Sequence, residues 1–288
     1  MESDLHPISE VNLLVKYADD TNLLVPENTD VSLDDEFTHI KEWAVKNCVN
    51  INFDKTKELV FHRPHPTKWH VPHSLEGIEQ VHMAKLLGVI FQSDFKFVDH
   101  VDATLKLCSQ GLFLLKQLRD QGMARGHLHT LFQAIVLNRI THAFPAWGPF
   151  LNIAVSQRIN GFFKRSYRYG FTNHVFKVHE LLDSAMSDLI TKIQSPEHCL
   201  HPLLPPKRRR SNRHRPKGHD YELPDCTYNF HKQSYVINCL FNFFVINSIC
   251  MYPHCTVRIR LSYACNKYFD FDFDYDDGGK FTPSPSGQ

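Results

Sequence analysis

Four consecutive residues near the start of the sequence, Tyr17-Ala18-Asp19-Asp20, have side chains suited to binding a divalent cation. Short apolar runs at residues 13–15 and 23–25 flank them, which predicts a tight β-hairpin with the charges at its turn. Carboxylate oxygens are the ligands that Mg²⁺ prefers, and two such ions about 4 Å apart can activate a hydroxyl and stabilise a departing pyrophosphate. The simpler alternative is an Asp-Asp turn on the surface, although adjacent carboxylates repel one another and stability alone gives no reason to pair them.

The segments after this tetrapeptide predict the elements that position it. Residues 32–48 have apolar side chains at helical spacing and begin with Ser32 and Asp35, which resemble a capping box. Residues 50–62 predict a strand, a turn and a strand, and residues 81–91 predict a second hairpin around KLLGVIF. From Val98 the apolar period becomes helical, which predicts helices over residues 98–122, 127–142 and 153–170. The fold class we expect is therefore α+β: β-hairpins with a packed helix, then an α-helical bundle, then an irregular basic C-terminal region.

Composition excludes several functional classes. The 288 residues carry 32 Lys+Arg against 31 Asp+Glu, so the net charge of +1 provides no global field to attract nucleic acid. The charges are nevertheless segregated, because residues 1–60 contain 13 acidic and 5 basic side chains, whereas residues 207–217 contain 7 Lys/Arg and no acid. Eight cysteines without a CxxC pair argue against a disulfide scaffold and for an intracellular protein. Residues 235–252 are the one candidate membrane span, but their asparagines disfavour it, so we expect no membrane partner.

Several motifs together resemble one family. VKYADDTNLLVPE, NINFDKTKELVF and KLLGVIF resemble, in this order, the last palm motifs of reverse transcriptases from non-LTR retrotransposons, which are LINE-type transposable elements. Six further segments continue the resemblance to about residue 241: LFLLKQLRDQGM, RITHAFPAWGPFL, QRINGFFKRSYRYGF, HELLDSA, HCLHPLLPPKR and GHDYELP. The resemblance implies the C-terminal part of a polymerase palm at 1–97, a thumb-like helical region at 98–170, and a C-terminal family region with the basic block at 171–244. Residues 245–288 match nothing in the family, and we expect a disordered tail there.

The resemblance implies an RNA-directed DNA polymerase, a nucleotidyltransferase that uses Mg²⁺, an RNA template and a DNA primer, without a small-molecule cofactor. Asp19 and Asp20 match the catalytic and metal-binding pair, with Asp19 as the more direct ligand. Lys55 and Lys57 belong to the family's NxxKTK element, where one lysine neutralises the pyrophosphate or acts as general acid; which of the two does so is left open.

The resemblance also implies binding residues. Tyr17 and Ala18 lie near the nucleotide and the primer end, and Leu87 and Gly88 match the turn of the primer-grip hairpin. Basic side chains suited to phosphate contacts lie in the third predicted helix and in the basic block: Lys164, Arg165, Arg168, Arg208, Arg209 and Arg210. The alternatives are a solvated helix face and a solvated linker. The basic block also resembles a nuclear-localisation signal, which would imply a nuclear location.

The sequence departs from the family pattern ahead of the YADD motif. The family places its fingers, its first catalytic Asp strand and its substrate loop there, whereas only a few residues precede the motif in this sequence. We therefore expect a truncated enzyme that is inactive alone, and an exposed sheet edge prone to aggregation or partner pairing. The alternatives are a non-catalytic nucleic-acid-binding remnant and a non-functional relic. A zinc site at His62, His65, His70 and His73 is a further, weaker alternative, because structural zinc sites usually contain Cys.

Overall fold

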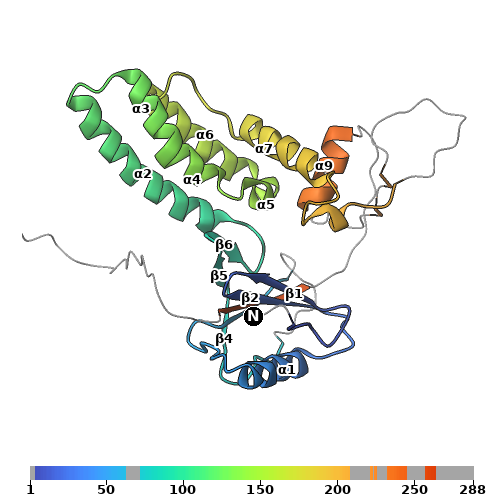
Figure 1. The fold of residues 1–288 in the computed structure, drawn as a ribbon. Coiled ribbons are helices and arrows are strands. Elements are labelled where there is room, and N and C mark those ends of the chain that lie inside the picture. The colour runs from blue at the N-terminus through green and yellow to red at the C-terminus, as the bar shows by residue number, and fades with distance from the viewer. Residues whose placement is uncertain are drawn as a thin grey trace, which may run out of the picture.

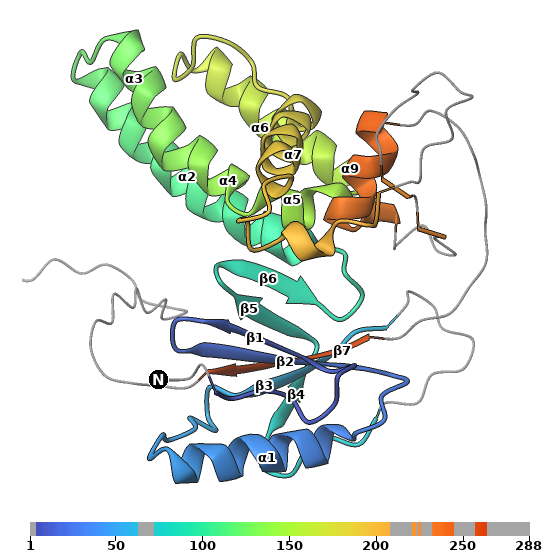
Figure 2. The same ribbon diagram turned by 45° about the vertical axis from the view of Figure 1, so that its right-hand side comes forward.

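A computed structural model of the chain describes residues 4–62, 72–207, 221–222, 224–225, 232–244 and 257–263. The fold is mixed α and β. A sheet forms one end of the molecule, and one helix covers the face of the sheet that is turned away from the other helices (Figures 1 and 2). Most of the helices form the other end, and a small hairpin lies between the sheet and these helices. The α+β expectation is confirmed at this level.

The sheet has five strands, and their spatial order differs from their order in the sequence. Across the sheet they are β1 (Leu13–Tyr17), β2 (Asp20–Pro26), β7 (Val257–Tyr263), β3 (Lys57–Val60) and β4 (Glu79–Val81). All neighbours are antiparallel except β3 and β4, which are parallel. The expected hairpin at the acidic tetrapeptide is therefore present as β1 and β2.

Helix α1 (Leu33–Lys46) packs on one face of this sheet. Its amphipathic sequence buries Phe37 and Ile40 against Leu23 and Val25 of β2, which form one apolar core. The hydroxyl of Ser32 accepts a hydrogen bond from the Asp35 backbone N–H at 3.2 Å, as its capping-box sequence predicts.

The second hairpin and the helical region follow in the chain. The hairpin pairs β5 (Met83–Leu86) with β6 (Val89–Gln92), as expected for KLLGVIF. The longer helices are α2 (Val98–Asp120), α3 (Arg125–Phe132), α6 (Ile153–Arg168), α7 (Val178–Ile193) and α9 (Tyr235–Phe244). Shorter helical segments are the π-helix Gln133–Leu137, α4 (Asn138–Thr141), α5 (Phe144–Trp147) and the 3₁₀ turns Gly148–Phe150 and His201–Leu203.

The helix boundaries follow the local signals in the sequence. Gly122 and Gly170 take the left-handed backbone conformation just after α2 and α6, with φ of 89° and 80°, which ends each helix where the sequence predicts. The expected helix over residues 127–142 is present as α3, the π-helix and α4 in succession.

The C-terminal part is more regular than the sequence predicts. The C-terminal family region, residues 171–244, contains α7 and α9, and the apolar side chains of Met186 and Ile190 are buried together with Cys239. The tail expected to be disordered, residues 245–288, contributes β7, which pairs with the edge of β2 that we expected to be exposed.

Among the described residues, no helix is long and apolar enough to cross a membrane.

Aromatic side chains join the sheet to the helical region. Phe61 follows β3, and its ring centroid lies 4.2 Å from that of Phe95 in the loop after β6. Phe95 and Phe97 lie 5.7 and 5.8 Å from Phe150, which precedes α6. Phe97 is fully buried although its φ of 47° is unfavourable for a non-glycine residue. The packing of its ring therefore stabilises a backbone conformation that the residue would otherwise avoid.

The buried Glu36 of α1 holds the segment that precedes β1. Its carboxylate accepts hydrogen bonds from the backbone N–H groups of Ile8 and Ser9 at 3.0 and 2.9 Å, and from the amide of Asn12 at 2.9 Å. Replacing Glu36 would leave these donors without an acceptor. The resulting loss in the free energy of unfolding exceeds the net contribution of the hydrogen bonds themselves, because buried donors without an acceptor are unfavourable.

We expect Glu36→Ala to lower the free energy of unfolding by about 3 kcal/mol, because it removes a charged acceptor from three buried or half-buried donors. Chemical denaturation monitored by circular dichroism measures the effect. Glu42→Ala, at an exposed position of the same helix, is the control and should change stability by less than about 0.5 kcal/mol. Equal effects of the two substitutions would contradict this role of Glu36.

Candidate functional site

The acidic tetrapeptide forms the turn between β1 and β2. Tyr17 and Asp20 are directly opposite each other in the register, so Ala18 and Asp19 form a two-residue loop. Ala18 has a φ of 53°, at a loop position where glycine is usual. Tyr17, Ala18 and Asp19 are exposed and Asp20 is half-buried, so the hairpin presents both carboxylates at one tip.

In this turn, burial and neighbouring charges shift the pKa of Asp20. Partial burial raises the pKa of Asp20, the charge of Asp19 raises it further, and the charge of Lys55 lowers it. The structure therefore brings three of the predicted catalytic residues into one electrostatic neighbourhood. A raised carboxyl pKa means that the folded state disfavours the ionised form, and a nearby cation would offset this penalty.

The two predicted lysines occupy different positions. Asn52 builds the turn that carries Lys55, because its side-chain oxygen accepts from the Lys55 backbone N–H at 3.0 Å and its carbonyl accepts from the Thr56 hydroxyl at 2.7 Å. Lys57, in contrast, forms an ion pair with Glu79 across β3 and β4. Of the two lysines left open by the sequence, Lys55 is the one whose charge lowers the pKa of Asp20.

The donor set of the turn fits one hard divalent cation. Mg²⁺ is commonly held by one or two carboxylates with water or phosphate oxygens in the remaining positions, and Asp19 and Asp20 would supply the carboxylates. When bound, such an ion supplies charge neutralisation at phosphate oxygens. Within the part of the chain that the structure describes, no group of three or more His, Cys, Asp or Glu side chains gathers as a metal site.

The predicted primer-grip residues form the other hairpin turn. Leu87 and Gly88 link β5 to β6, and both have positive φ, of 47° and 86°. The Leu87 carbonyl lies 2.9 Å from Nε2 of His142, which follows α4. A Cβ at position 88 would lie 3.1 Å from the same nitrogen, so Gly88 permits the hairpin to approach the helical region this closely.

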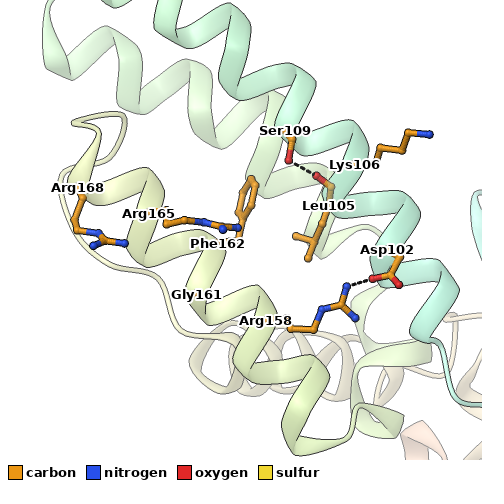
Figure 3. A pocket seen from close by; sticks show the side chains of 9 residues that line it. All are labelled: Asp102, Leu105, Lys106, Ser109, Arg158, Gly161, Phe162, Arg165 and Arg168. Atoms are coloured by element: carbon orange, nitrogen blue, oxygen red, sulfur yellow. Dashed lines mark hydrogen bonds and ion pairs between the residues drawn. The ribbon is translucent and has the colours of Figure 1, made fainter.

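A cleft of about 730 Å³ lies between α2 and α6, and Figure 3 shows the side chains that line it. From α2 come Asp102, Leu105, Lys106 and Ser109, and from α6 come Arg158, Gly161, Phe162, Arg165 and Arg168. Four cationic side chains and one carboxylate belong to this lining, and Figure 3 shows that Lys106 extends away from α6. The α6 residues recur every three or four positions, which places them on one face of that helix.

The cleft has an apolar floor and a charged rim. Phe162 is buried, whereas Arg165 and Arg168 are exposed at the cleft. Arg158 is engaged in an ion pair with Asp102, which links α6 to α2. Guanidinium groups on an open rim are suited to phosphate oxygens, because each presents its N–H donors in a planar fork.

The other predicted binding residues are divided between this region and the undescribed part of the chain. Lys164 is exposed on α6 but does not line the cleft. The neighbouring Tyr167 of α6, which is not one of the predicted binding residues, is 39% exposed, and its ring centroid lies 5.6 Å from Cζ of Arg125. Arg208, Arg209 and Arg210 lie outside the described residues, as do His65 and His70 of the alternative zinc site.

Sequence reasoning missed Asp102, Lys106 and Arg158 as parts of this site. A signal was present, because Asp102 and Lys106 are four residues apart in a predicted helix, and Arg158 and Arg165 are seven apart in another. Which two helices face each other, however, is not encoded in either spacing.

Comparison of the chain with protein-family models, with curated proteins and with solved structures gave no match.

The charge of Asp19 raises the pKa of Asp20, so we expect Asp19→Asn to lower the pKa of Asp20 towards its ordinary value of 3.8. A pH titration of the Asp20 carboxyl carbon by NMR measures the change. Asp34→Asn, in the first turn of α1, removes the same charge elsewhere and should leave the Asp20 pKa unchanged. An Asp20 pKa that stays the same or rises in Asp19→Asn would contradict the electrostatic description of the turn.

Proposed function

We propose that this chain binds RNA without sequence preference through the cleft between α2 and α6, and that it contains palm and thumb regions of a LINE-type reverse transcriptase. The observation that carries the binding proposal is that Arg165 and Arg168 are exposed on the rim of one cleft. Phosphate contacts by Lys and Arg supply the sequence-independent part of nucleic-acid affinity.

The dimensions of the cleft favour a polymer over a small anion. From Arg158 to Arg168 the α6 face extends over about 15 Å, at a rise of 1.5 Å per residue. That length corresponds to roughly four nucleotides at about 3.4 Å each along one strand. The exposure of Arg165 and Arg168 favours weak, salt-dependent binding, because charges in water are screened.

The family proposal rests on the nine sequence motifs and is supported by the acidic turn. The charges of Asp19, at the hairpin tip, and Lys55, in the turn before β3, both affect the pKa of Asp20, as expected of residues that hold Mg²⁺ and a pyrophosphate. The implied activity is RNA-directed DNA synthesis on an RNA template from a DNA primer. A nuclear location, which rests on the basic block at residues 207–217, belongs to the same proposal.

We expect the double substitution Arg165→Ala/Arg168→Ala to weaken RNA binding and its salt dependence. Each phosphate contact on a single strand contributes about −0.7 to the slope of log affinity against log salt, so losing two contacts flattens the slope by about 1.4. Fluorescence anisotropy of a labelled 12-nucleotide RNA between 50 and 200 mM salt gives the slope.

The matched control is Lys46→Ala/Lys192→Ala, which removes the same charge from the exposed faces of α1 and α7. Its slope should remain that of the unaltered chain. If both double variants bind identically, the cleft is a solvated helix face. A separate triple change of Arg208, Arg209 and Arg210 to Ala shows how much of the remaining slope belongs to the basic block.

For catalysis, we expect no primer extension above background when the chain alone receives an RNA template, a DNA primer, dNTPs and Mg²⁺. The described residues bring two carboxylates to the turn, a set that suits one ion, whereas nucleotidyl transfer uses two. Denaturing gels of a labelled primer measure extension. Extension that persists in Asp34→Asn but disappears in Asp19→Asn would prove this expectation wrong and establish the turn as catalytic.

A further inference from the structure

The most unusual feature of the sheet is the origin of its central strand. β2 and β3 are consecutive strands in the sequence, are joined through α1, and are not paired with each other. β7, about 200 residues later in the sequence, lies between them and pairs with both (Figure 2). Since β7 is antiparallel to both, β2 and β3 run in the same direction, as in a split β-α-β unit.

The gap between β2 and β3 is one strand wide. Neighbouring strands lie about 4.8 Å apart, so two strands that each pair with a third are separated by about 10 Å. Helix α1 lies in the crossover that connects the two strands, and its Phe37 and Ile40 pack on Leu23 and Val25 of β2. Both walls of the gap therefore lie within residues 20–60.

Both walls of the gap include residues that are buried in the structure. Leu23 on β2 is 1% exposed, and Leu59 and Glu58 on β3 are 0% and 2% exposed. Each strand would present a row of unpaired backbone N–H and C=O groups without an occupant between them. An occupant that satisfies both rows at once must be an extended backbone.

The wall residues also define the sequence that fits. The register places position 259 opposite Leu24 and Leu59, and position 260 opposite Leu23 and Glu58. Glu58 is a buried carboxylate that accepts from the Leu75 backbone N–H at 3.2 Å, so a basic residue opposite it favours pairing by charge. In this chain Arg260 holds that position.

We propose that the gap between β2 and β3 is a binding site for one extended peptide strand with a basic residue opposite Glu58. Residues 257–263 fill it in this structure, and a separate peptide of that sequence fills it when they do not. The peptide binds by strand addition on two sides. Its backbone hydrogen bonds to β2 and β3 provide the affinity, and Glu58 provides the preference for a basic residue opposite it. The proposal does not rest on RNA binding, although the register, which pairs Asp20 with Tyr263, brings the end of the bound strand to the acidic turn.

The test uses the full chain and hydrogen exchange at the amides of β2 and β3. With neighbours on both sides, the amides of a strand are all paired, whereas with one neighbour about half of them are. In the unaltered chain we expect slow exchange throughout Thr21–Val25 and Glu58–Val60. Fast exchange of half of these amides in the unaltered chain would overturn the proposal.

Ile259→Pro removes a backbone donor and breaks a central strand, whereas Ile259→Thr retains the donor. We expect the proline variant, but not the threonine variant, to exchange about half of the β2 and β3 amides at least tenfold faster. Adding the peptide TVRIRLSYA should restore slow exchange, and TVRPRLSYA should not. Amides of the buried Val101 and Leu115 in α2 report whether the rest of the chain is folded. A folded proline variant that the first peptide fails to protect would refute the proposal.

A refolding experiment decides the question if the proline variant does not fold. The unaltered chain is diluted from urea in the presence of excess fluorescent TVRIRLSYA, which competes with residues 257–263 for the gap. Size-exclusion chromatography should show the peptide eluting with the chain, at least tenfold above fluorescent TVRPRLSYA. Equal amounts of the two peptides would exclude a strand-accepting site.

Discussion

The packing of aromatic rings between the sheet and the helical region is the interaction on which the rest of the structure depends. Phe97 is fully buried at the start of α2 and lies between Phe91 of β6 and Phe150, with ring centroids 5.4 and 5.8 Å away. Because Phe97 offers α2 no side-chain cap, Oε1 of Gln92 accepts instead from the Val98 backbone N–H at 3.0 Å. This junction fixes where α2 begins, and therefore where its half of the cationic cleft lies relative to the sheet.

The two charged features of the molecule lie on opposite sides of this junction. The carboxylates belong to the β1–β2 turn of the sheet, whereas the exposed arginines belong to α6 in the helical region. This separation matters physically, since carboxylates and guanidinium groups in contact neutralise each other, as Asp102 and Arg158 do. A near-zero net charge is thus compatible with one surface for phosphates and another for a cation.

The sheet shows a second constraint, the need to pair every buried strand edge. Leu23 and Leu59 are buried on two strands that do not meet, so the strand between them is essential to both. Nothing local in VRIRLSY at residues 257–263 indicates this role, because short alternating segments occur in many contexts. The assignment of residues 245–288 as a disordered tail failed to anticipate β7 for this reason.

Elements defined by contacts within a few residues were determined by the sequence alone. Ser32 caps α1, Gly122 follows α2, and the two-residue turns at Ala18-Asp19 and Leu87-Gly88 close their hairpins as predicted. Tertiary structure decided which side chains share a site. Arg158 meets Asp102 across 56 residues of sequence, and β7 enters the sheet from more than 190 residues beyond β3. Such contacts depend on how whole elements pack, and the free energy of that packing is spread over many buried side chains rather than carried by a local motif.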